Sequence, residues 1–183
     1  MNTATHSPGA QATAPILVVG LGNPILGDDG VGWRVAEAVL TRLASGAPAL
    51  PPAAVEVDCL SLGGLSLMER LIGYRQVILI DSITTHRHPP GALLCFPLES
   101  LPDLSGGHTM SSAHDSSLQT ALEMGRRLGA ALPERVEVVA IEAEFVYDFS
   151  EELSPPIQAA AAAAEQAVID IISQMIEERN DFS

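Results

Sequence analysis

Residues 16–32, Ile-Leu-Val-Val-Gly-Leu-Gly-Asn-Pro-Ile-Leu-Gly-Asp-Asp-Gly-Val-Gly, contain the pattern that decides the fold. The apolar run at 15–21 has the length of a strand and is typical of a strand buried on both faces. A turn-rich loop follows at 22–30, and from Val31 apolar residues recur at helical spacing until Ser45-Gly46 closes the helix. A buried strand that leads through a turn into a helix is the repeating unit of a layered α/β domain.

The same alternation of strand and helix continues along the chain. Further strands are expected at 53–60, 77–80, 91–97 and 136–141, and further helices at 65–72, from about 112 to 125, and at 155–175. Too few residues join the third and fourth strands for a helix, so the fourth should run antiparallel to the third. The sequence therefore predicts a single three-layer α/β domain. Its sheet is mainly parallel and five-stranded, with one antiparallel strand and helices on both faces.

Composition bounds the protein class and the domain limits. The 183 residues include 9 basic and 23 acidic side chains, and the net charge of −14 argues against a nucleic-acid partner. The two cysteines suit reduced thiols, the N-terminus lacks a signal-peptide pattern, and the apolar runs are shorter than the roughly 20 residues that span a bilayer. We expect a cytoplasmic protein with no membrane partner. Residues 1–14 are assigned to a flexible tail, 15–176 to the domain and 177–183 to a C-terminal tail.

The glycine-rich loop invites comparison with a dinucleotide-binding turn, but the spacing does not fit. Gly20 and Gly22 match that fingerprint, whereas Ile25 stands where its third glycine should allow close packing of helix on strand. Asp28 and Asp29 would also repel a pyrophosphate at the helix start. Nucleotide binding is therefore disfavoured.

Three polar residues stand where such a sheet places its ligands, beyond the carboxyl ends of the strands. Asp29 lies in the loop after the first strand, Asp81 closes the third strand, and His114 opens the helix that begins near residue 112. Two carboxylates and an imidazole can hold a divalent metal and leave coordination positions open. A structural role is the alternative for each: helix capping for Asp28 or Asp29, a turn for Asp81, and solvent exposure for His114.

Other chemically capable residues have weaker support. Cys59 is interpreted as a small buried hydrophobe, since no base stands near it in the sequence. The serines lack a Gly-x-Ser-x-Gly elbow, which argues against serine-hydrolase chemistry. The remaining candidates are two loop histidines with metal-binding spacing, one histidine in a glycine-rich loop and two acids after the fifth strand: His86, His88, His108, Glu142 and Glu144.

The stretch at 16–32 resembles the corresponding loop of the nickel–iron hydrogenase maturation endopeptidases. The likeness continues in the family's order through Ile80-Asp-Ser-Ile83, with Pro90-Gly91 downstream, then Ser112-Ala-His114, and then Leu153-Ser-Pro-Pro156 before the last helix. These pieces extend from residue 16 to about residue 172. The first motif is fairly specific for this family, and the shorter motifs support the resemblance only in combination.

The resemblance implies an endopeptidase that removes the C-terminal extension from a [NiFe] hydrogenase large-subunit precursor. In that family three groups grip the nickel already inserted in the precursor, and they fall here on Asp29, Asp81 and His114. These are the expected catalytic and metal-binding residues, with nickel carried by the precursor and no permanent cofactor. The general base is unassigned, with Asp28 and His108 as candidates.

Two other functions stay open at this point. One is a non-catalytic metal- or nucleotide-binding module, and the other is a metal-dependent hydrolase of small substrates, which tight stoichiometric metal in the purified protein would favour. The chain also departs from the family's pattern at 58–64, Asp-Cys-Leu-Ser-Leu-Gly-Gly, and at 99–113. Both departures bear on which precursor is selected.

Overall fold

The computed structural model describes residues 16–46, 48, 54–100, 115–144 and 149–181. Its centre is one five-stranded sheet with the strand order β2-β1-β3-β5-β4. The strands are β1 (Ile16–Leu21), β2 (Val55–Leu60), β3 (Gln76–Ile83), β4 (Leu93–Pro97) and β5 (Arg135–Glu142). The first three strands and β5 are parallel, and β4 alone runs antiparallel. The predicted fold class is therefore confirmed.

Strand β4 lies at the edge of the sheet and pairs with β5, from Leu93 opposite Ile141 to Pro97 opposite Glu137. The direction predicted from the short connection after β3 is correct, although β4 does not lie beside β3. The Gly91 N–H donates to the Glu142 carbonyl and the Glu142 N–H donates to the Ala92 carbonyl, at 2.8 and 2.9 Å. These bonds direct the returning chain along β5.

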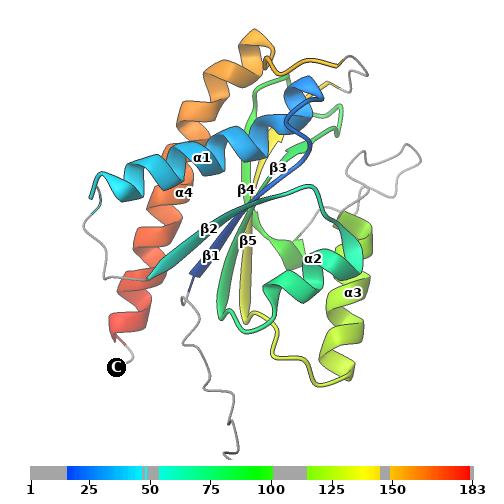
Figure 1. Ribbon diagram of the computed structural model, residues 1–183, viewed down its shortest axis with the longest axis vertical. Coiled ribbons are helices and arrows are strands. Elements are labelled where there is room, and N and C mark those ends of the chain that lie inside the picture. The colour runs from blue at the N-terminus through cyan, green and yellow to red at the C-terminus, as the bar shows by residue number, and fades with distance from the viewer. Residues whose placement is uncertain (1–15, 47, 49–53, 101–114, 145–148, 182–183) are drawn as a thin grey trace, which may run out of the picture.

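Helices cover both faces of the sheet (Figure 1). Helices α1 (Val31–Ala44) and α4 (Pro155–Asp181) pack together on one face, and α2 (Gly64–Leu71) and α3 (Asp115–Arg127) pack together on the other. Alternate residues of β1 point to the two layers: Ile16 and Val18 join the first core, and Leu17 and Val19 join the second. Continuous apolar strands are thus buried on both sides, as their sequence indicates.

Helix α4 continues to Asp181, past the predicted end at Met175 and into the segment assigned to a C-terminal tail. Two contacts explain the extension: Ile176 is buried, and Glu178 accepts a hydrogen bond from the Arg135 Nη1 at 2.8 Å. Its alanine-rich composition also makes Pro155–Glu178 long and apolar enough to span a membrane by those criteria alone. The helix buries a stripe of side chains against the sheet and α1, as the core helix of a folded domain does.

The carboxyl ends of β1, β2, β3 and β5 meet at one edge of the sheet, which we call the carboxyl edge. Strand β3 runs to Ile83, so Asp81 lies within the strand and does not close it as the sequence analysis expected. The extension follows from pairing, because β5 stays in register with β3 from Asp81 opposite Ala140 to Ile83 opposite Glu142.

Candidate active site at the carboxyl edge

Two glycines allow helix α1 to begin directly on the strand ends. A Cβ on Gly32 would collide with the carbonyl oxygens of Leu21 and Ile80, so the first turn of α1 touches both β1 and β3. Gly22 has a φ of +111°, and a Cβ there would strike the backbone of Asp29. The loop after β1 therefore folds back on itself over the end of the sheet.

Asp29 lies in a short 3-10 turn, η1 (Gly27–Gly30), that contacts β3. Its Oδ2 accepts a hydrogen bond from the Asn23 N–H at 2.6 Å, which ties the carboxylate to the start of its own loop. The helix-capping alternative is wrong for both aspartates, because Leu26 and Gly30 occupy the N-cap positions of η1 and α1. Asp29 is half-buried as a residue.

Asp81 is 4% exposed and is the first β3 residue beyond the pairing with β1, which ends with Gly20 opposite Ile80. Its Oδ1 accepts a hydrogen bond from the Ser82 N–H at 2.9 Å. A turn-forming role is wrong, since the residue is flanked by β5 within a continuing strand. Burying a carboxylate is costly unless it is bonded or paired, so this position indicates a functional role.

The structure brings the segments that carry Asp29 and Asp81 into contact at the carboxyl edge. The third predicted ligand, His114, and the candidate base His108 lie outside the described residues. Within the described part of the chain, no three His, Cys, Asp or Glu side chains gather closely enough to hold a metal ion. The predicted metal site therefore depends on a residue whose placement the structure does not give.

Glu142, at the end of β5, is 2% exposed and clamps the loop that follows β3. Its Oε1 accepts hydrogen bonds from the Thr85 N–H at 2.7 Å and the His86 N–H at 2.8 Å, and its Oε2 accepts one from the Thr85 hydroxyl at 2.6 Å. His86 has a φ of +56°, a strained value for a residue with a side chain. Glu142 thus holds strained backbone a few residues after Asp81, whereas Glu144 is exposed.

Asp28 binds a different element from its neighbour Asp29. Its Oδ1 accepts a hydrogen bond from the Ser154 N–H at 2.6 Å, immediately before helix α4. Sequence reasoning named Asp28 only as a capping residue or a base and gave no role to Ser154 beyond the family motif. A serine followed by two prolines at a helix start was the available signal, because Pro is favoured in the first helical turn.

The remaining chemically capable residues lie in surroundings that do not indicate a catalytic role. Burial and the nearby Glu37 and Asp58 carboxylates raise the pKa of the Cys59 thiol to about 11, which makes it a poor nucleophile and agrees with the predicted inert role. The Ser61 hydroxyl donates to the Gly22 carbonyl at 2.7 Å, so the divergent 58–64 segment contacts the turn after β1. His86 and His88 are exposed in the loop after β3.

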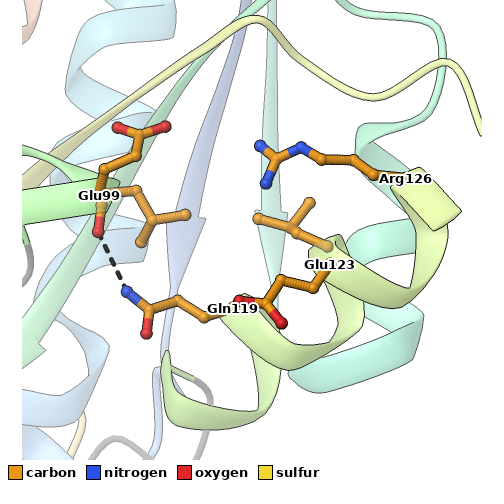
Figure 2. A pocket seen from close by; sticks show the side chains of 6 residues that line it. Glu99, Gln119, Glu123 and Arg126 are labelled. Atoms are coloured by element: carbon orange, nitrogen blue, oxygen red, sulfur yellow. Dashed lines mark hydrogen bonds between the residues drawn. The ribbon is translucent and has the colours of Figure 1, made fainter.

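Two hollows among the described residues lie away from Asp29 and Asp81. One of about 260 Å³ lies between the end of β4 and helix α3, and Figure 2 shows Glu99 on one wall and Gln119, Glu123 and Arg126 on α3. The Gln119 amide donates to the Leu98 carbonyl at 3.2 Å across it. Another, of about 280 Å³, lies between α1 and α4. Neither Asp29 nor Asp81 lines these two hollows, so they do not locate the candidate site.

Comparison with known proteins places this architecture among hydrogenase-processing enzymes. Residues 54–171 match the family model HycI, hydrogenase maturation protease. The hydrogenase 2 maturation protease of Escherichia coli strain K12 is 27% identical over 126 residues, which cover 69% of this chain and 71% of that protein.

Solved structures agree over most of the chain. The hydrogenase maturating endopeptidase HybD from Escherichia coli superimposes with a TM-score of 0.69 at 25% identity, covering 87% of this chain and 93% of that one. The hydrogenase 2 maturation peptidase from Thaumarchaeota archaeon SCGC_AB-539-E09 gives 0.59 at 28% identity, over 86% and 97%. The [NiFe] hydrogenase maturation protease HybD from Thermococcus kodakarensis, at 22% identity and 0.58, supports the fold alone.

Proposed function

This chain belongs to the hydrogenase maturation protease family, whose members are peptidases, and from that premise we propose that it removes the C-terminal extension of a [NiFe] hydrogenase large-subunit precursor. The nickel ion already carried by the precursor is the recognition signal, and the enzyme holds no permanent cofactor. The residues that bind this nickel are Asp29, Asp81 and His114. The cellular site of the reaction is the cytoplasm.

One observation supports this assignment above the others: the turn that carries Asp29 contacts the strand that carries the buried Asp81. The two segments are about fifty residues apart in the sequence, and they meet at the edge where α/β sheets bind ligands. Carboxylate oxygens with a histidine nitrogen are donors that suit a divalent first-row metal.

A site of this kind can promote peptide hydrolysis in two ways. A bound metal ion can polarise the scissile carbonyl, or it can lower the pKa of a bound water so that hydroxide attacks. In both cases the residues of this chain position the nickel of the precursor against the bond to be cut. Specific cleavage then follows from the requirement that nickel be present in the substrate.

The test is a cleavage assay on nickel-loaded and nickel-free large-subunit precursor from the same organism, with product mass as the readout. We expect cleavage of the nickel-loaded precursor only. Asp29→Ala, Asp81→Ala and His114→Ala should each slow it by roughly 100-fold or more, since loss of even a supporting residue at a metal site costs 10- to 100-fold. Glu144→Gln, an exposed carboxylate at the same edge, is the matched control and should cleave normally.

Cleavage that proceeds equally without nickel would refute the recognition step. Normal cleavage by the Asp29→Ala and Asp81→Ala variants would refute the assignment of the site. Saturable binding of free metal with no processing of any precursor would favour the non-catalytic module instead.

A further inference from the structure

The loop after β1 is attached to the segment that precedes helix α4 by a ladder of backbone bonds. Leu26 forms a parallel bridge with Ser150. The Gly27 N–H donates to the Ser150 carbonyl at 2.6 Å, and the Ser150 N–H donates to the Ile25 carbonyl at 3.1 Å. The candidate nickel ligand Asp29 therefore lies in a loop whose position is set by a segment more than a hundred residues later in the chain.

The Asp28 carboxylate completes this attachment at the start of α4. Ser154 is the residue before the helix, and its carbonyl accepts the first helical bond, from the Gln158 N–H at 2.8 Å. Pro155 and Pro156 have no N–H to offer, so Ser154 supplies the donor that Asp28 binds at 2.6 Å. A carboxylate at this position also interacts favourably with the positive end of the helix dipole.

The two neighbouring aspartates serve different partners because of the local backbone. In a 3-10 turn, with 3.0 residues per turn, successive side chains project about 120° apart. Asp28 accordingly binds the start of α4, whereas Asp29 binds the Asn23 N–H at the start of the loop. The Asp28 Oδ1 is thus occupied by the Ser154 N–H.

We infer that Asp28 is a positioning residue for the nickel-binding carboxylate of Asp29, and that it is not the proton-transferring base. Asp28 holds the η1 turn against the start of α4. This turn then places Asp29 beside β3. The inference rests on the proposed function for its effect on cleavage, whereas its structural part holds for the free protein.

The test compares Asp28→Asn with Asp28→Ala in the full chain. The asparagine oxygen still accepts the Ser154 N–H, but an amide cannot take up a proton at neutral pH, so a base would be lost and a positioning residue would be retained. We expect Asp28→Asn to keep kcat within about threefold of the wild type and Asp28→Ala to lose roughly 10-fold or more per folded molecule. Glu152→Ala, an exposed acid on the same segment, is the control.

A second readout needs no substrate. Amide hydrogen exchange of the free protein should show faster exchange at Ser154 and also at Asn23 in Asp28→Ala, with both amides protected in Asp28→Asn. If Asp28→Asn is as inactive as Asp28→Ala, Asp28 acts through its proton chemistry and the inference is overturned. Unchanged Asn23 exchange in Asp28→Ala overturns it as well, because the effect would not reach Asp29.

These readouts separate the two claims. If the wild-type protein cleaves no precursor, the proposed function is refuted. The exchange measurement still tests whether Asp28 positions the Asp29 turn. Should Asp28→Ala not fold, Asp28→Asn alone decides, since a base role predicts an inactive variant and a positioning role predicts an active one.

Discussion

Two loops meet at the carboxyl edge, and each is held by a carboxylate in a different way. In the loop after β1, residues 22–30, the half-buried Asp28 accepts one hydrogen bond, from the Ser154 N–H, beside the backbone bonds to Ser150. The loop after β3, residues 84–92, depends on Glu142, which is 2% exposed and accepts three hydrogen bonds. The first attachment reaches a distant helix, and the second comes from the neighbouring strand.

The difference shows which of the predicted ligands is fixed by the sheet. Asp81 belongs to a central strand, and the chain that follows it is bonded to β5 through Glu142 and through the Thr84 hydroxyl, which donates to the Ala143 carbonyl at 2.9 Å. Asp29 belongs to a turn outside the sheet, which is held by loop contacts and by its packing on β3. Asp81 is thus held by the sheet itself, and Asp29 by contacts between loops.

The largest expected effect on stability is at Glu142. Glu142→Ala leaves the Thr85 and His86 amides and the Thr85 hydroxyl without their acceptor, and it should lower the free energy of unfolding by about 3 kcal/mol. Removing the single bond of Asp28 should cost only about 1 kcal/mol, comparable to the loss of a helix cap. Urea denaturation of Glu142→Ala and Asp28→Ala measures both values.

Glu142→Gln is the matched control, because its amide oxygen keeps one acceptor and its volume is unchanged. We expect it to recover at least half of the stability lost in Glu142→Ala. If Asp28→Ala proves more destabilising than Glu142→Ala, the ranking of the two attachments is wrong.

A smaller effect of opposite sign is expected at His86. Its φ of +56° is unfavourable for a residue with a side chain and favourable for glycine. His86→Gly should therefore raise the free energy of unfolding by about 1 kcal/mol in thermal or urea denaturation. The gain should shrink in the Glu142→Ala background, where the loop no longer has to hold this conformation. Destabilisation by His86→Gly would contradict the strain argument.

The end of β2 offers a contrast that appears only at high pH, since burial there protects a neutral thiol. The pKa of Cys59 is raised from 9.0 to about 11, so the folded chain holds this proton more tightly than the unfolded chain. The associated stability is complete below pH 9 and is lost as the pH rises through about 11. Urea midpoints between pH 8 and pH 11 should fall less in Cys59→Ala than in the wild type; parallel curves would refute this.

The sequence was sufficient for the fold because the decisive signals are local. The apolar run at 16–21, the glycine-rich turn and the helical spacing from Val31 together predict β1, the loop and α1 with almost no error. The burial of Asp81 within a strand was harder to predict from the sequence. Pairing with β5 prolongs this strand, and its own apolar pattern does not.

Long-range polar contacts account for most of what the sequence left open. Asp28 and Ser154 are 126 residues apart, and Glu142 and Thr85 are 57 apart, so no periodicity links either pair. A carboxylate that follows the apolar residues Val138–Ile141 was the available clue to Glu142, and it did not name the partner. The assignment of Asp29, Asp81 and His114 as ligands stays a prediction from the motifs.

The position of α4 in the chain has a consequence for biosynthesis. Its start binds Asp28, and Gly91 packs so closely on the same turn that an added Cβ would lie only 2.7 Å from the Pro156 carbonyl oxygen. The loops after β1 and β3 therefore both depend on a helix that follows every strand of the sheet. While the ribosome is still producing the earlier elements, these loops lack their partner, and we expect the candidate site to be complete only when α4 has docked.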